Sequence, residues 1–211
     1  MILFTVNANA QTLNKVLLFV SREGSGDMEF MLTNEVGVMM DMLKEAGYEV
    51  KVALPLGKPL VGGKTTLNPD LDLADVKVSD YLGFVMPCMG QGGLPIFNES
   101  FEIVKQAVLE EKPIAAQQSA IEILAQSGAL KGRKYVYAQD LGIDGATYCG
   151  IGVVADKMVV TSAVCPEVAK LFGLQDGTSE LIKEFVALLP SRIGVESKSK
   201  LAILWGVIKT K

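Results

Sequence analysis

The sequence predicts an α/β protein built as a three-layer sandwich, with a mostly parallel sheet between two layers of helices. Short apolar runs without alternation recur along the chain, and such runs are typical of strands covered on both faces. Segments with helical periodicity separate most of these runs, and this alternation favours parallel strand pairing. The 211 residues, 49% of them apolar and 21% charged, suit one domain with a large core.

Four apolar runs are expected to form the centre of the sheet, at residues 15–20, 49–53, 82–86 and 113–116. The run "KYVYA" at 134–138 is expected to add a strand. The segment "GIGVVADKMVVTS" at 150–162 predicts a hairpin around Ala155, Asp156 and Lys157. Residues 55–80 are rich in turn-forming residues and predict an excursion with short strands.

Helices are expected at residues 34–46, 99–111, 119–127 and 178–189, where apolar side chains recur with helical spacing. Thr33 or Asn34 can cap the first helix, and Gly47 can end it. Gly128 can close the third helix in the left-handed conformation.

The two ends of the chain are expected to lie outside this domain, which spans residues 15–190. Residues 1–14 fit either a disordered leader or the remnant of a signal peptide, because Ala8, Asn9 and Ala10 resemble a signal-peptidase site. The first interpretation predicts a cytoplasmic protein, which we expect; the second predicts an exported one. Residues 191–211 form an extension whose apolar run, 201–208, is expected to dock on the body or on a partner.

Composition excludes several kinds of chemistry. The chain has no histidine, which rules out a Ser-His or Cys-His pair and a histidine-bound metal. Its three cysteines, Cys88, Cys149 and Cys165, are widely spaced and form no zinc pattern. The net charge is −4 and no basic patch is evident, so we expect no nucleic acid as partner, and we expect neither a metal nor a cofactor. No apolar run is long enough to predict a membrane span.

Three loops should meet beyond the carboxyl ends of the strands, where α/β proteins form their sites. They are residues 21–32, 87–95 and 117–119. The last is a sharp turn between a strand and a helix, the place where many α/β enzymes carry a nucleophile. Here the turn reads Gln117, Gln118, Ser119, and an amide is no nucleophile.

Four segments, in order, resemble the ThiJ/PfpI superfamily, over roughly residues 15–189. They are "AGYEVKVALPLGKPL", "YLGFVMPCMGQGG", "KPIAAQQSAIEILAQSGALKGRK" and "GVVADKMVVTS". The resemblance implies the flavodoxin-like fold of class I glutamine amidotransferases. It also implies an activity within a range that includes glyoxalase-like, deglycase-like, chaperone-like, amidase and intracellular protease-like functions.

The chain departs from the family pattern where the family carries its chemistry. The nucleophilic cysteine of the family falls on Gln118, and the histidine often beside it falls on Ser119. The glycine pair that helps to form the oxyanion site falls on Cys88 and Met89. By this resemblance the former active-site positions are Glu35, Cys88, Met89, Gln117, Gln118 and Ser119.

One acidic position of the family pattern is retained. In the family, a glutamate near the start of the first helix contacts the cysteine sulfur. Counted back from Gly47, this glutamate falls on Glu35. The resemblance places Glu35 opposite Gln118, whose amide can donate a hydrogen bond to the carboxylate. Glu29 is the rival assignment but requires an insertion. Without the resemblance, Glu35 reads as a carboxylate favoured by the helix dipole.

The other site residues also have simpler interpretations. Ser119 can cap the helix that follows it. Cys88 fits core packing better than a relocated nucleophile, because no histidine can lower its pKa. Cys165 lies close to where some family members place a triad partner, so it can line the pocket.

Three hypotheses follow. The first is a pseudoenzyme that binds a small molecule or a partner at the former active site. The second is a rewired hydrolase or lyase, with Glu35 and Cys88 as catalytic candidates. The third is a chaperone-like or structural dimer.

The resemblance and the apolar C-terminal run predict a homodimer. A specific interface buries on the order of 1,200–2,000 Å² in total. Light scattering that shows a monomer at micromolar concentration would contradict this prediction.

Overall fold

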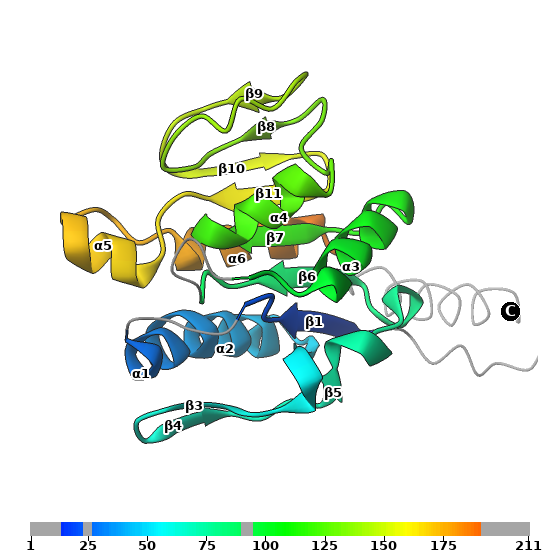
Figure 1. Ribbon diagram of the computed structural model, residues 1–211, viewed down its shortest axis with the longest axis vertical. Helices are drawn as coiled ribbons and strands as arrows, with labels where there is room; N and C mark the ends of the chain where they lie inside the picture. Colours follow the sequence, from blue (N-terminus) through cyan, green and yellow to red (C-terminus); the bar gives the residue numbers. More distant parts are fainter. Residues whose placement is uncertain (1–13, 23–26, 90–94, 191–211) are drawn as a thin grey trace, which may run out of the picture.

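The computed structural model describes residues 14–22, 27–89 and 95–190, and it has the predicted three-layer α/β architecture (Figure 1). Within these residues the central sheet has seven strands in the order β10-β11-β7-β6-β1-β2-β5. All neighbours pair in parallel except β10 and β11. The strands are β1 (Lys15–Phe19), β2 (Glu49–Leu54), β5 (Leu71–Asp72), β6 (Gly83–Met86), β7 (Ile114–Gln117), β10 (Val153–Asp156) and β11 (Val159–Ser162).

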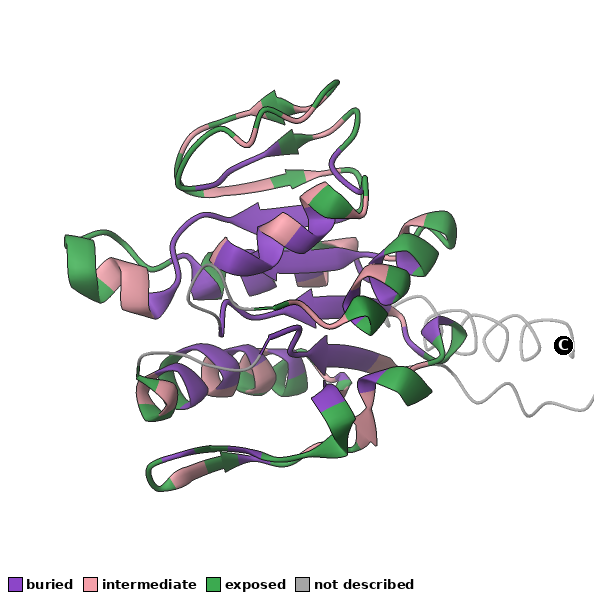
Figure 2. Cartoon of the chain, in the orientation of Figure 1, coloured by how far each residue is buried: buried purple, intermediate pink, exposed green. Residues whose placement is uncertain are grey.

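Helices cover both faces of the sheet and form two separate cores (Figure 2). One face carries a long helix in three parts, α1 (Met28–Met31), the π-helix η1 (Leu32–Gly37) and α2 (Val38–Glu45), together with α6 (Thr178–Leu188). The other face carries α3 (Asn98–Leu109) and α4 (Ile121–Gln126). Strand β1 shows why its sequence does not alternate: Val16 and Leu18 face the first core, and Leu17 and Phe19 the second.

Smaller elements surround the sheet. Strands β3 (Leu60–Gly62) and β4 (Thr65–Leu67) form the expected short strands of the excursion, with three-residue helical turns at Pro55–Gly57, Leu73–Asp75 and Val78–Asp80. The hairpin is confirmed as β10 and β11, and β11 continues the sheet beside β7. Helix α5 (Pro166–Phe172) was not expected from the sequence.

The strand expected at 134–138 is shorter than predicted. Only Lys134–Tyr135 forms a strand, β8, and it pairs with β9 (Thr147–Tyr148) rather than with the central sheet. The helix ends agree with prediction, since Gly47 and Gly128 both adopt positive φ, 88° and 75°, directly after their helices.

The predicted start of the first helix is wrong. The helix begins at Met28, because the carboxylate of Asp27 accepts a hydrogen bond from the Phe30 amide at 3.1 Å and caps it there. Thr33 and Asn34 are therefore inside the helix. Their side chains donate to the carbonyl oxygens of residues four positions earlier, at 2.8 Å in each case.

The predictions for residues 1–13 and for the extension 191–211 fall outside the described residues. Across the ranges that the structure describes, no helix combines the length and the apolar character needed to cross a bilayer.

Gly83, the first residue of β6, allows α6 to approach the sheet closely. A Cβ atom at this position would lie 2.8 Å from the Phe185 ring, 2.9 Å from Leu189 and 3.0 Å from the Pro113 carbonyl oxygen. We predict that Gly83→Ala lowers the free energy of unfolding by about 1–3 kcal/mol, since overpacking forces neighbours out of place. Urea unfolding measures this loss.

Two further variants control this prediction. In Gly83→Ala combined with Leu189→Ala, the total loss should be smaller than the sum of the single losses, because one clashing group is gone. Gly37→Ala should cost less than Gly83→Ala, since its Cβ would meet a single atom, at 3.3 Å. Additive losses at positions 83 and 189 would contradict the close-packing explanation.

Candidate functional site

The carboxyl ends of β1, β6 and β7 lead into segments that meet around Cys88. Its backbone N–H donates to Glu35 Oε1 at 2.7 Å, and its thiol donates to Gln118 Oε1 at 3.3 Å. The Ser119 hydroxyl donates to the Cys88 carbonyl oxygen at 2.6 Å. These contacts join the first helix, the end of β6 and the end of β7 at one point. Residues 23–26 and 90–94 of the first two loops lie outside the described residues.

The strand-to-helix turn after β7 has the shape of a nucleophile elbow. Gln118 follows the strand directly and has a φ of 43°, in the left-handed region that residues other than glycine rarely adopt. The turn thus holds residue 118 in the strained conformation typical of an elbow nucleophile. The side chain at that position is a carboxamide, so the elbow turn is present but carries no nucleophilic atom.

Ser119 does not cap the following helix, contrary to the sequence interpretation. It lies within the turn Gln118–Ala120, and the N-cap position of α4 is Ala120, which has no capping side chain. The hydroxyl instead satisfies the Cys88 carbonyl from across the site.

Glu35 is the buried acid of the site. It lies in the π-helix η1, and its side chain is fully buried. It accepts hydrogen bonds from the backbone N–H groups of Cys88 and Met89. Among the described residues, its second oxygen, Oε2, has no hydrogen-bond partner.

Burial, reinforced by the nearby Cys88, raises the pKa of Glu35 well above its usual value, although the two N–H donors oppose this shift. The carboxyl group is therefore protonated well above the pH at which an ordinary glutamate ionises.

Two alternative readings of the acidic residues are wrong. Glu35 is not at a helix N-terminus, since the helix begins at Met28, so the helix-dipole interpretation fails. Glu29 is exposed, and it accepts from the Lys64 amide beside the β3–β4 hairpin, away from Cys88. The expected hydrogen bond from the Gln118 amide to Glu35 is not among those that the described residues form, because the amide oxygen faces the Cys88 thiol.

The segment after β6 keeps a glycine-like backbone without glycine. Met89 has a φ of 34° and is buried. The N–H groups of Cys88 and Met89 are the donors that would stabilise an oxyanion in this segment, but both are bound to Glu35.

The three cysteines have different environments. Cys88 and Cys165 are buried and Cys149 is exposed. A hydrogen bond with Cys88, together with burial, raises the pKa of Cys165. The described contacts of the Cys88 sulfur include Gln118 Oε1, the Ser119 hydroxyl at 3.6 Å and the Cys165 thiol. None of these three groups is a cation, which is the kind of neighbour that typically activates a thiol.

A charged pair with a buried arginine was missed by sequence reasoning. Arg22, 2% exposed, follows β1 and pairs with Glu122, in the first turn of α4. Tyr137 donates to Glu122 at 2.6 Å. Burial opposes ionisation of Glu122, but the bonds from Tyr137 and Arg22 lower its pKa. The one available signal was the position of Arg22 in the loop after the first strand.

Gln117 has a structural role. Its side chain is fully buried and its amide donates to the Val164 carbonyl at 2.8 Å and to the Thr178 hydroxyl at 2.9 Å. These bonds tie β7 to the start of α6. Within the described ranges, no group of three or more His, Cys, Asp or Glu side chains is arranged to hold a metal ion.

We predict a pH-dependent contribution of Glu35 to stability. Because its folded pKa is raised, the folded state keeps a proton that the unfolded state releases near its ordinary pKa of about 4.3. The free energy of unfolding should therefore fall as pH rises from about 4.3 towards the folded pKa. Glu35→Gln cannot titrate, so urea unfolding over a pH series should show the wild type losing stability relative to this variant. A difference that is constant with pH would contradict the assignment.

Known proteins resemble this chain in sequence and in fold. The model of the DJ-1/PfpI family matches residues 14–175. An uncharacterized protein of Archaeoglobus fulgidus is 38% identical over 130 residues, which are 57% of this chain and 75% of that protein. A protein named as a deglycase, from Thermococcus kodakarensis, is 28% identical over 152 residues, 69% of this chain and 88% of that protein.

Solved structures share the fold. A DJ-1 superfamily protein from Agrobacterium tumefaciens has a TM-score of 0.61 at 18% identity, covering 93% of this chain and all (100%) of that chain. A ThiJ/PfpI domain protein from Brachyspira murdochii has a TM-score of 0.59 at 17% identity, covering 83% of this chain and 95% of that chain. With the elbow, the buried glutamate and a family model that spans most of its length, the chain belongs to the DJ-1/PfpI family.

Proposed function

We propose that this chain is a family member without cysteine-dependent catalysis, which binds a small ligand at the former active site. The observation that carries the proposal is the strained elbow occupied by Gln118, whose oxygen is bonded to the Cys88 thiol. A turn that costs conformational energy is retained, while the atom that would use it chemically is absent. Such a site can still orient a bound molecule.

The contacts around Glu35 also support a non-catalytic role. An oxyanion hole requires N–H donors aimed at the reacting oxygen. Here the Cys88 and Met89 donors are engaged by a carboxyl group that is itself buried. A substrate carbonyl would have to displace Glu35 to use them.

Gln118 is the residue that we propose contacts the ligand. Its side chain is partly exposed, and no hydrogen bond from its amide nitrogen is among those that the described residues form. It can donate to a carbonyl, carboxylate or hydroxyl oxygen of a small molecule. Screening small metabolites by thermal shift against wild type and Gln118→Ala tests this, since a ligand at the site should stabilise the wild type more. A ligand that stabilises both equally binds elsewhere.

A second function is favoured by one observation, the similarity to a protein named as a deglycase. On this reading Cys88 would act as nucleophile and Glu35 as proton donor. The Cys88 thiol would first have to ionise beside the buried Glu35 carboxyl group. Iodoacetamide labelling tests this requirement. A fast-reacting thiol at Cys88 supports an enzyme that uses Cys88 as its nucleophile. Labelling confined to the exposed Cys149 supports the proposed ligand-binding protein without cysteine-dependent catalysis.

We predict no glyoxalase, deglycase or peptidase activity in the wild type. Loss of a nucleophile or its base typically lowers the rate by several orders of magnitude. Gln118→Cys should restore little, because the chain has no histidine and the Cys88 and Met89 donors stay bound to Glu35. Methylglyoxal consumption and peptide cleavage are the measurements.

A single pattern of results would replace this proposal with the rewired enzyme. The wild type would turn over substrate well above buffer, the rate would survive Gln118→Ala, and it would fall with Cys88→Ser or Glu35→Gln. The homodimer and a chaperone-like role stay predictions, to be tested by light scattering and by aggregation assays.

A further inference from the structure

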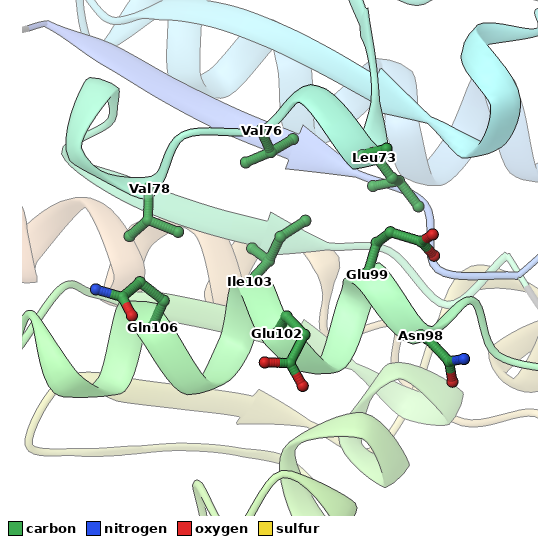
Figure 3. A pocket seen from close by; sticks show the side chains of 9 residues that line it. Leu73, Val76, Val78, Asn98, Glu99, Glu102, Ile103 and Gln106 are labelled. Atoms are coloured by element: carbon green, nitrogen blue, oxygen red, sulfur yellow. The ribbon is translucent and has the colours of Figure 1, made fainter.

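A pocket whose lining includes none of the candidate-site residues lies between α3 and the segment that connects β5 to β6 (Figure 3). Its volume is about 440 Å³, and its apolar walls are Leu73, Val76, Val78 and Ile103. It runs along α3 from Asn98, at the start of the helix, to Gln106 near its end. We call it the α3 pocket.

The rim of the α3 pocket is acidic. Glu99 and Glu102 of α3 line it beside the apolar walls (Figure 3). Glu102 pairs with Lys105 on the surface of the helix, whereas Glu99 forms no ion pair within the described part of the chain. An apolar pocket with carboxylates at its edge suits a segment that combines large apolar side chains with basic ones.

The chain itself contains such a segment. Residues 201–208 read "LAILWGVI", with Lys198 and Lys200 before them and Lys209 and Lys211 after them. The 21 residues after Pro190 contain five basic residues and one acidic residue, whereas the other 190 contain 15 basic and 23 acidic residues. The segment and the body thus carry opposite net charge.

The segment starts close to the α3 pocket. Leu189 packs against Gly83, at the amino end of β6. Val78, at one end of the pocket, is five positions before Gly83 in the sequence, which limits their separation to about 18 Å. Fully extended, the 21 residues reach about 70 Å, so the apolar run can reach the pocket of its own chain.

We propose that the apolar run 201–208 docks in the α3 pocket of the same chain, with its flanking lysines against Glu99 and Glu102. The apolar side chains fill the cavity between Val76, Val78 and Ile103, and the lysines provide the charge that the rim attracts. Trp205, the largest side chain of the run, is the natural anchor.

Trp205 is also the single tryptophan of the chain, so its fluorescence reports on the run without any label. In the full-length wild type we expect emission at short wavelength and protection from acrylamide. The variant Ala74→Lys, Glu99→Lys, Glu102→Lys places bulk and positive charge at the pocket. It should shift the emission to longer wavelength and raise the quenching constant several-fold.

Charge-matched variants separate docking from loss of fold. Asp41→Lys with Glu45→Lys changes exposed carboxylates on α2, on the opposite face of the sheet, and should leave the emission unchanged. Lys198→Glu, Lys200→Glu and Lys209→Glu alter the segment alone and should also release Trp205. Combining the pocket and segment reversals should restore part of the protection through swapped charges.

Three outcomes would overturn the proposal. Trp205 exposed in the wild type would mean that the run does not dock. Protection that survives both reversals would place the run elsewhere. Protection lost on dilution, in step with dissociation of a dimer seen by light scattering, would assign the pocket to the run of a second copy.

Discussion

The buried carboxyl group of Glu35 is the contact on which the candidate site depends. It holds the backbone N–H groups of Cys88 and Met89, and so fixes the end of β6 against the first helix. That end in turn carries the thiol and the carbonyl to which Gln118 and Ser119 bind. Because the group is fully buried, its pKa is raised well above the usual value, which favours the neutral acid over an unpaired buried charge.

The site contains two backbone positions held in the left-handed region by residues other than glycine. Met89 adopts a φ of 34° and Gln118 a φ of 43°. Both positions tolerate strain because packed neighbours and hydrogen bonds hold them. A mutation at such a position alters chemistry more readily than it alters shape.

The parts of the structure set by local sequence were predictable, and those set by distant contacts were not. The central strands follow from apolar runs, and Gly47 and Gly128 end their helices as expected. The first helix was placed too late because Thr33 and Asn34 are also favourable capping residues, and only the fold shows that Asp27 is the cap. Ser119 binds a carbonyl 31 positions away, and Arg22 pairs with an acid 100 positions away. The local sequence around Ser119 or Arg22 does not indicate which distant residue it will contact.

The π-helix Leu32–Gly37 has a consequence for the orientation of Glu35. A π-helical turn contains one residue more than an α-helical turn, and it leaves the helix before it and after it out of phase. Each residue of an α-helix is rotated by about 100° from the last. If one residue were deleted between Met31 and Val38, the stretch could relax to an ordinary α-helix. The side chain at position 35 would then turn away from Cys88 while the apolar face of α2 stayed on the sheet. The extra residue thus rotates the first part of the helix relative to the second. One set of side chains can then pack in the core while Glu35 points into the site.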